Sequence, residues 1–361
     1  MRTRPVMLIA LSVGLLAGCT GVIFQPERDH RLDPADHGVA YRDVWFRASD
    51  DVRLHAWFLP AEADSARATI VLAHGNAGNI STHVASVAWL REHGYNVFAF
   101  DYRGYGRSQG TPTMAGVHRD TAAALRAADR SDDLGPDRLV LLGQSLGGAI
   151  ATVTAARLPD ERAPAALVID SAPSDYRGIA RDKAAAFWPT WPLQVPLSWL
   201  ITDDFAAIDA AGELPAIPKL FIGNRRDRVV PFSHTRELYA AAPPPRACWR
   251  IAHPRHLATF ALEPVRRRLI IWLERALNDP PLVSPSLDCP PEETAARETP
   301  REEQGIQPPR PDYRPGGSRG LARAGAEVAA IDRTESEVHV GIACRAVPGV
   351  PGGVSLLPGN L

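Results

Sequence analysis

One serine stands in a setting that suits a nucleophile. Ser145 is the centre of the pattern Gly-Gln-Ser-Leu-Gly, which follows the apolar run 138–142 and precedes a helix-like stretch, Leu146–Leu158. In a strand-to-helix turn, small flanking residues keep side chains out of the crowded backbone, and the serine hydroxyl stands at a helix N-terminus. The helix dipole there favours developing negative charge. We therefore predict that Ser145 is a nucleophile, the alternative being a tight glycine-rich turn with an incidental serine.

A serine needs a base to become nucleophilic at neutral pH, and the base needs a carboxylate to orient it. Asp227 directly follows the predicted strand Lys219–Ile222 and is the candidate acid. The alternative is a solvated loop aspartate paired with a neighbouring arginine. Asp203, Asp204 and Asp170 are the rival acids.

Two histidines follow the predicted strand Ala247–Ile251 and could supply the base. We prefer His256, which directly precedes the last predicted helix and comes after a loop long enough to return to the serine. His253 is followed by a proline, which favours an extended conformation next to the strand end. The choice between the two histidines stays open at this point.

A tetrahedral intermediate also needs hydrogen-bond donors for its oxyanion. The backbone N–H of Leu146, directly after the serine, is the first candidate. The second is the backbone N–H of Asn76, in the loop His-Gly-Asn-Ala-Gly-Asn that follows the predicted strand Ala68–Ala73. His74 in this loop is interpreted as a structural histidine. No Gly-Lys-Ser/Thr follows the loop, so a phosphate-binding loop is not indicated.

The elements that must position these residues alternate between strand-like and helix-like segments from about Tyr41 to Ala276. Such alternation with short connections predicts an α/β fold with a mostly parallel sheet of about eight strands and helices on both faces. The first two strands are predicted to form an antiparallel hairpin. The predicted strands are Tyr41–Ala48, Val52–Leu59, Ala68–Ala73, Tyr95–Phe100, Arg138–Leu142, Ala166–Ile169, Lys219–Ile222 and Ala247–Ile251. The predicted helices are Thr82–Glu92, Thr113–Ala128, Leu146–Leu158, Glu237–Ala242 and Leu257–Ala276.

The interval 174–218 breaks this rhythm and is predicted to be a short lid. It carries an aromatic and apolar group that could line an acyl pocket. The alternative is that these side chains only pack the lid onto the domain. The group is Phe187, Trp188, Trp191, Trp199 and Leu200.

Several of these motifs recur in the order typical of the α/β-hydrolase superfamily, and the chain resembles that superfamily over about 41–277. The resemblance rests on His74–Asn79, the run Phe100–Ser108, the serine turn, Asp227 and His256. The serine-aminopeptidase-like branch, with its esterases, lysophospholipases and thioesterases, is the most similar. Two departures are Gly223-Asn224, where members often have His-Gly, and Arg255-His256, where they often have Gly-His.

This resemblance implies a cofactor-independent serine hydrolase with the triad Ser145, Asp227 and His256. It also implies that Asp101–Ser108 is structural, supporting the loop beneath the serine turn. We expect cleavage of carboxylic ester or thioester bonds in a small-molecule or lipid-like acyl substrate. The alternatives are a serine peptidase of the aminopeptidase-like type and a non-catalytic protein that keeps the fold.

The N-terminus resembles a bacterial lipoprotein signal. Two arginines precede the apolar run Val6–Ala17, which is too short to span a bilayer and ends in Leu-Ala-Gly-Cys19. The resemblance implies removal of residues 1–18 and a lipid anchor on Cys19. Thr20 stands where an aspartate would retain the protein at the inner membrane, so we expect a periplasm-facing site on the outer membrane. The alternative is an ordinary cleaved signal.

Charge, ligand spacing and composition bear on three further features: a nucleic-acid partner, a metal site and the C-terminal segment. The net charge is −1 with no strongly basic block, so no nucleic-acid partner is indicated. No His-Glu-x-x-His or other clustered ligand spacing predicts a metal. From about Asn278 to Leu361 prolines and glycines are frequent and no hydrophobic period is sustained, which predicts a disordered tail rather than a second domain.

Overall fold

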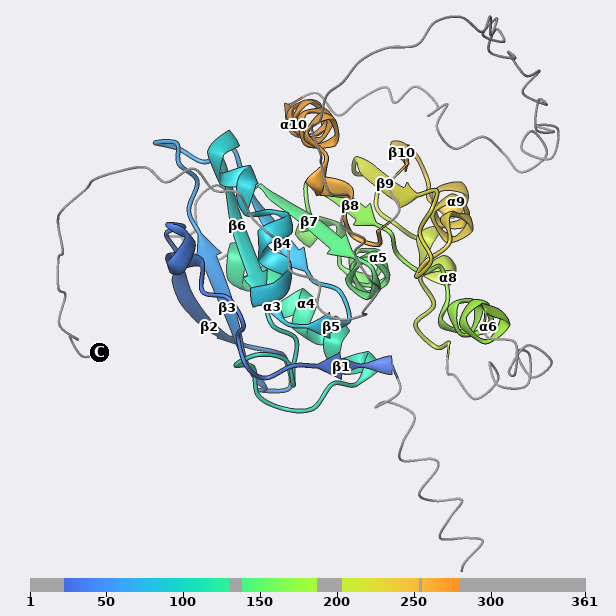
Figure 1. Cartoon of the computed structure of the whole chain (residues 1–361), viewed down its shortest axis with the longest axis horizontal. Coiled ribbons are helices and arrows are strands. Elements are labelled where there is room, and N and C mark those ends of the chain that lie inside the picture. The colour runs from blue at the N-terminus through green and yellow to red at the C-terminus, as the bar shows by residue number, and fades with distance from the viewer. Residues whose placement is uncertain (1–22, 130–137, 187–202, 253–254, 279–361) are drawn as a thin grey trace, which may run out of the picture. The chain divides into compact units, whose positions relative to one another are not determined.

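The computed structural model describes residues 23–129, 138–186, 203–252 and 255–278 (Figure 1). All of them belong to the first of the two units into which the chain divides at Pro290–Pro291. The predicted signal peptide, the lipid-attachment residue Cys19 and the predicted tail after its first residue, Asn278, lie outside the described residues. Asn278 itself belongs to the last helix. Among the helices that the structure describes, none is long and apolar enough to cross a bilayer.

An eight-stranded sheet forms the centre of this unit, as predicted. The strand order is β10-β9-β8-β7-β4-β6-β3-β2. β2 pairs antiparallel with β3 and β3 pairs antiparallel with β6, whereas every other neighbouring pair is parallel. The strands are β2 (Arg42–Arg47), β3 (Arg53–Leu59), β4 (Ala68–Ala73), β6 (Tyr95–Phe100), β7 (Leu139–Gln144), β8 (Ala166–Asp170), β9 (Lys219–Asn224) and β10 (Arg246–Ile251).

Both faces of the sheet are covered, which explains why its central strands are continuous apolar runs. In β4, Val71 belongs to one apolar core and Ile70 to the other, and all six residues of the strand are buried. The first core includes residues of α4 (Met114–Asp129), α5 (Leu146–Arg157), α8 (Ala207–Ala211) and α9 (Phe232–Ala241). The second includes residues of α3 (Ile80–His83), the 3₁₀ helix η3 (Ala88–His93) and α10 (Glu263–Asn278).

The helix predicted over Thr82–Glu92 is instead a short α3 followed by two 3₁₀ turns. Side chains compete there for the backbone carbonyls: Ser86 Oγ donates to the His83 carbonyl at 2.7 Å, and Trp89 Nε1 donates to the Ser86 carbonyl at 2.8 Å. Serine side chains favour such local bonds over a regular helix. The segment does end at Gly94, whose φ of 83° is left-handed, as expected of a helix-terminating glycine.

The last helix starts later than predicted, at Glu263 rather than Leu257. Leu257 has a φ of 57°, which is incompatible with a right-handed helix. The intervening residues stay in a loop next to the sheet, with one 3₁₀ turn at Thr259–Ala261. This loop carries His256.

A small parallel sheet was not predicted. β1 (Gln25–Pro26) pairs with β5 (Ala77–Gly78), so the N-terminal segment lies along the loop that follows β4. The predicted lid contributes α6 (Tyr176–Ala186) and α8. The lid residues Phe187, Trp188, Trp191, Trp199 and Leu200 lie outside the described residues.

Candidate active site

Ser145 lies between β7 and α5, in the strand-to-helix turn that its sequence pattern predicts. Its φ of 52° and ψ of −122° are unfavourable for a residue with a side chain. Hydrogen bonds hold the turn in place: the Ser145 N–H donates to the Asp170 carbonyl at 2.8 Å, and the Gly148 N–H donates to the Ser145 carbonyl at 2.8 Å. The strained backbone is thus fixed by its neighbours on β8 and α5.

The two glycines of the pattern are required by close backbone approach. A Cβ on Gly147 would lie 2.1 Å from the carbonyl oxygen of Ala73, at the end of β4. A Cβ on Gly143 would lie 2.5 Å from the carbonyl oxygen of Gly147. Both distances are impossible for real atoms, so only glycine lets α5 start this close to the sheet.

His256 links the serine to an acid. Its Nε2 lies 2.9 Å from Ser145 Oγ, and its Nδ1 lies 2.6 Å from Asp227 Oδ2. Asp227 is in the loop between β9 and α9, and His256 is in the loop between β10 and α10. The three residues follow strands β7, β9 and β10, whose carboxyl ends share one edge of the sheet. The structure therefore brings the three predicted triad residues together.

The surroundings of Asp227 keep it ionised. Its side chain is buried, which would raise the carboxyl pKa, but hydrogen bonds from His256 and from two backbone N–H groups outweigh burial and lower the pKa. The two N–H groups belong to Val229 and Val230 and donate to Oδ1 at 2.7 and 3.1 Å. A carboxylate can only accept, so the His256 proton lies on Nδ1 and the lone pair of Nε2 faces Ser145.

The first predicted oxyanion donor, the Leu146 N–H, is at the first position of α5. The helix start leaves this N–H without an intrahelical acceptor. The second, Asn76, lies in the loop after β4, and this loop adjoins the triad: a Cβ on Gly75 would lie 3.3 Å from Leu257 Cδ1. Leu257 directly follows His256.

His74 sets the orientation of the Gly75–Asn76 peptide. Burial lowers the pKa of His74 to about 3, so its ring is neutral at physiological pH. Nδ1 carries the proton, because it lies 2.7 Å from the Gly75 carbonyl oxygen, which can only accept. In a trans peptide the carbonyl and the following N–H point in opposite directions. The Asn76 N–H therefore points away from the His74 ring, and His74 has the structural place that we expected.

The rival acids have other contacts. Asp170, at the end of β8, accepts from Thr259 Oγ1 at 2.8 Å and Ser171 Oγ at 3.1 Å. Asp203 accepts from the Tyr176 N–H at 2.8 Å, at the start of α6. Asp204 lies in the turn before α8. The rival base, His253, lies outside the described residues.

Among the residues that the structure describes, two clusters have the residue types of metal ligands, and the geometry of both favours hydrogen bonding. In the first, His30 Nε2 and His55 Nδ1 contact Asp101 Oδ2 at 3.0 and 3.3 Å. A metal on His30 Nε2 would place the ring proton on Nδ1, which is buried without a partner within the described part of the chain. In the second, with Asp175 and Glu237, His234 already accepts from the Ser174 N–H through Nδ1 at 3.2 Å.

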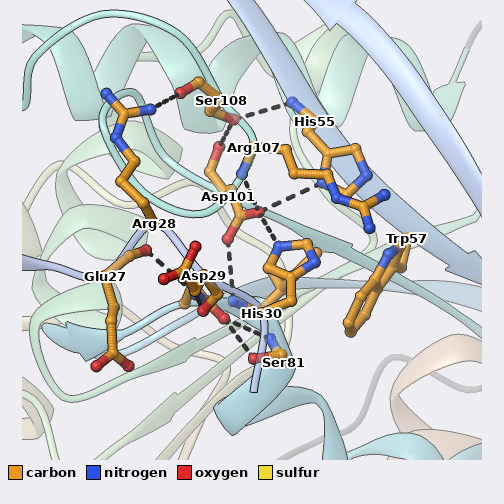
Figure 2. A network of polar contacts seen from close by, with 12 residues as sticks. Glu27, Arg28, Asp29, His30, His55, Trp57, Ser81, Asp101, Arg107 and Ser108 are labelled. Atoms are coloured by element: carbon orange, nitrogen blue, oxygen red, sulfur yellow. Dashed lines mark hydrogen bonds and ion pairs between the residues drawn. The ribbon is translucent and has the colours of Figure 1, made fainter. Parts of the chain in front are cut away.

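A network of polar contacts surrounds Asp101, in the loop after β6 (Figure 2). Burial would raise the pKa of Asp101, but hydrogen bonds from His30 and His55 outweigh it and lower the pKa. The other carboxyl oxygen accepts from the Ile80 N–H at 3.0 Å, at the start of α3. Ser108 Oγ donates to the Asp101 carbonyl at 2.7 Å. The network fixes the loop after β6 against the loop after β4, in line with the structural role expected of Asp101–Ser108.

Comparison with known proteins agrees with this architecture. Residues 64–213 match the family described as serine aminopeptidase, S33. The chain is 36% identical to the uncharacterized protein YfhR of Escherichia coli K12, over 65% of this chain and 81% of that protein. It is 33% identical to the alpha/beta hydrolase domain-containing protein WAV2 of Arabidopsis thaliana, over 60% of this chain and 71% of that protein. The chain belongs to the α/β-hydrolase superfamily. Among solved structures, the Pyrococcus furiosus esterase Pf2001 has the same fold, with a TM-score of 0.57 and 23% identity over 71% of this chain and 98% of that chain.

Within the α/β-hydrolase fold, the two departures from the usual pattern leave the triad intact. Gly223 allows close packing against α9, because a Cβ there would lie 2.3 Å from Thr235 Oγ1. The neighbouring Asn224 is buried and donates to Thr259 Oγ1 at 3.2 Å. Arg255 precedes His256 without displacing its ring from Ser145. Both departures are therefore compatible with the hydrolase arrangement.

Proposed function

We propose that this α/β hydrolase is a cofactor-independent serine hydrolase that cleaves carboxylic ester or thioester bonds through an acyl-enzyme. The observation that carries the proposal is the continuous chain of contacts from Ser145 Oγ through His256 to the ionised Asp227. A serine hydroxyl facing the unprotonated nitrogen of an oriented imidazole is the arrangement that nucleophilic acyl transfer requires.

In the first half of the reaction, Ser145 Oγ attacks the acyl carbon and His256 Nε2 takes the hydroxyl proton. Asp227 stabilises the imidazolium that forms. The N–H groups of Leu146 and Asn76 donate to the oxyanion of the tetrahedral intermediate. His256 then gives its proton to the departing alcohol or thiol, the bond to the leaving group breaks, and the acyl group stays on Ser145.

In the second half, a water molecule replaces the leaving group. His256 takes one water proton while the water oxygen attacks the acyl-serine carbon. The same oxyanion donors act again, and the proton returns to Ser145 Oγ as the carboxylic acid leaves. Ser145 and His256 end in their starting protonation states, so the proposed reaction consumes only the substrate and water and needs no cofactor.

A serine peptidase is the second candidate, favoured by the match to the serine aminopeptidase family over residues 64–213. Peptide recognition needs groups that bind a terminal amine or a side chain. Within the described residues, the lid interval adds only α6 and α8, and we propose that this is too little to form such a site. The test is the rate of ester hydrolysis divided by the rate of aminoacyl-anilide hydrolysis. The ester assignment would be supported if this ratio is far higher with the enzyme than in the uncatalysed reactions.

We also propose that Cys19 carries a lipid anchor and that the enzyme faces the periplasm from the outer membrane. The support is the Leu-Ala-Gly-Cys sequence after a short apolar run, with Thr20 following. An anchored hydrolase meets acyl lipids at high local concentration, so a lipid-like acyl ester is the substrate class that we favour.

Labelling with a fluorophosphonate probe tests the nucleophile directly, because an activated serine displaces the fluoride and becomes phosphonylated. Wild-type protein should be labelled, and Ser145→Ala should not. Ser174→Ala is a matched control: Ser174 Oγ also contacts a histidine, His234 Nδ1 at 2.7 Å, but that nitrogen already accepts from the Ser174 N–H. The control should stay labelled. A folded wild-type protein that resists labelling would remove the hydrolase proposal.

A further inference from the structure

The N-terminal segment lies directly against the loop that carries Asn76. We call residues 23–31 the strap. β1 of the strap pairs with β5 of that loop, Gln25 opposite Ala77 and Pro26 opposite Gly78. The Glu27 N–H extends the pairing by donating to the Gly78 carbonyl at 3.1 Å. The predicted oxyanion loop is thus one strand of a two-stranded sheet whose other strand is the strap.

Asn76 is held by its side chain, independently of its backbone N–H. Its Oδ1 accepts from the Gln25 N–H at 3.0 Å and from the Tyr105 hydroxyl at 3.0 Å, and its Nδ2 donates to the Ile23 carbonyl. The amide orientation is unambiguous, because the Gln25 N–H can only donate and the Ile23 carbonyl can only accept. The strap therefore satisfies both ends of the side chain of the residue whose N–H we assign to the oxyanion.

The far end of the same loop is held in the same way. Asn79 Nδ2 donates to the carbonyls of Glu27 and Asp29 at 3.1 and 2.7 Å. The Arg31 N–H donates to Ser81 Oγ at 2.9 Å. The strap contacts this loop from Asn76 to Ser81.

The strap is fixed in turn to the loop after β6. His30 Nε2 donates to Asp101 Oδ2 at 3.0 Å, and its ring packs edge-on against Trp57 (Figure 2). The Gly106 N–H donates to the Glu27 carbonyl at 2.8 Å. Arg28 donates to the carbonyl of Ser108 at 2.5 Å. The strap bridges the two loops, and its hydrogen bonds to them join residues fifty or more positions apart in the sequence.

We propose that the strap sets the position of the Asn76 N–H, with Tyr105 and His30 as positioning residues, so that full activity requires the docked strap. The proposal rests on the proposed function, because it assumes that the Asn76 N–H stabilises an oxyanion. Loss of an oxyanion donor costs about 10²–10³-fold in kcat, and a donor that is only misoriented should cost less. The Asn76 N–H forms a weaker hydrogen bond to the carbonyl oxygen of the bound ester than to the oxyanion of the transition state. A misoriented N–H should therefore lower kcat and leave KM nearly constant.

Tyr105→Phe tests the link nearest to Asn76, because it removes one hydroxyl and keeps the buried ring. We expect kcat on a soluble p-nitrophenyl ester to fall about 10-fold, with KM and the midpoint of the pH–rate profile unchanged. Tyr95→Phe is the matched control, because Tyr95 is as buried as Tyr105. Tyr95 is the first residue of β6, whereas Tyr105 lies in the loop that follows the other end of this strand. The control should keep wild-type kcat.

His30 provides a second test, which stays informative even if the variant Tyr105→Phe does not fold. His30→Ala removes the bond to Asp101 and should lower kcat with little change in KM. His30→Gln should restore most of the activity, because a glutamine side-chain amide can donate from the place of His30 Nε2. Activities are compared below the unfolding temperature of every variant, so that a difference in stability alone does not count.

The outcomes separate the two proposals. If the wild-type enzyme is active and both Tyr105→Phe and His30→Ala keep its kcat, the proposal that the strap positions the Asn76 N–H is overturned. The hydrolase assignment would then still stand. Equal losses in His30→Ala and His30→Gln would also count against it, because the donor would then be irrelevant. A folded wild-type enzyme that neither hydrolyses esters nor reacts with the fluorophosphonate would overturn both.

Discussion

Asp170 has an unusual environment for a carboxyl group. It is fully buried at the end of β8, and burial raises its pKa to about 6, although hydrogen bonds from Thr259 and Ser171 act in the opposite direction. Its Oδ2 has no hydrogen-bond partner within the described residues. The native state therefore holds a proton on Asp170 between about pH 4 and pH 6, where the unfolded chain has already lost it. Ionisation of Asp170 above pH 6 destabilises the fold.

Asp170→Asn should remove this penalty, because the amide stays neutral and its oxygen can still accept from Thr259. At Asp170 the native state binds more protons than the unfolded state in this window, so the contribution of this group to the free energy of unfolding falls as pH rises from 4 to 6. The free energy of unfolding of Asp170→Asn minus that of wild type should therefore be larger at pH 7.5 than at pH 4.5, by about 1–3 kcal/mol. Urea unfolding at the two pH values measures it. A difference that does not change with pH would contradict the assigned pKa.

The triad residues could be predicted because each follows a predicted strand along a parallel sheet. Chain order and the shared edge of a parallel sheet favoured Ser145, Asp227 and one of two histidines. The resemblance to the superfamily then implied His256 rather than His253. The role of Tyr105 could not be predicted in this way. Its hydroxyl reaches Asn76 only because the loops after β4 and β6 meet in space, and no local pattern in either loop encodes that contact.

At the scale of elements, the junction of β7 and α5 depends on backbone contact rather than on side chains. β4 lies between β6 and β7 in the sheet, so its carboxyl end cannot move aside. Gly147 abuts the carbonyl oxygens of Ala73 and His74 at that end. The start of α5 is therefore fixed by the strand, and the position of Ser145 follows.

Gly147→Ala should disrupt this junction. Its Cβ would lie 2.1 and 2.3 Å from the two carbonyl oxygens, which must then shift with β4. We expect the free energy of unfolding to fall by about 3 kcal/mol or more, measured by urea unfolding, or the variant to fail to accumulate as folded protein. Gly212→Ala is the control, because the nearest atom to its Cβ, the Ala241 carbonyl oxygen, is 3.9 Å away. Equal stabilities of the two variants would contradict the explanation.

The strands were predicted well because burial on both faces makes each of them a continuous apolar run bounded by turns. Two elements were not predicted correctly, the helix at Thr82–Glu92 and the strand β1. In both, contacts that a helix or strand pattern does not encode decide the structure. α3 and the following 3₁₀ turns replace a regular helix where Ser86 and Trp89 bond to nearby carbonyls. β1 has only two residues, and its pairing with β5 cannot be recognised from its own sequence.

For the whole molecule, the proposed lipid anchor is the feature that places the enzyme in the cell. Cys19→Ser should move the protein from the membrane fraction to the soluble fraction when the full chain is produced in a Gram-negative host, because the thiol is the attachment atom. Immunoblots of fractionated cells measure this. Thr20→Asp is a second arm, which should shift the protein from the outer to the inner membrane. Membrane association that survives Cys19→Ser would contradict the anchor.

The docked strap limits where an anchored enzyme can meet its substrate. Cys19 is four residues before Ile23, whose carbonyl is bonded to Asn76. Four residues span at most about 14 Å, so a lipid on Cys19 would hold the oxyanion loop close to the bilayer surface. Encounter with substrate would then be a search in two dimensions, governed by the mole fraction of the ester in the membrane rather than by its bulk concentration. Diluting a lipid substrate with inert lipid should slow the anchored enzyme, even when the total amount of substrate in the suspension is constant.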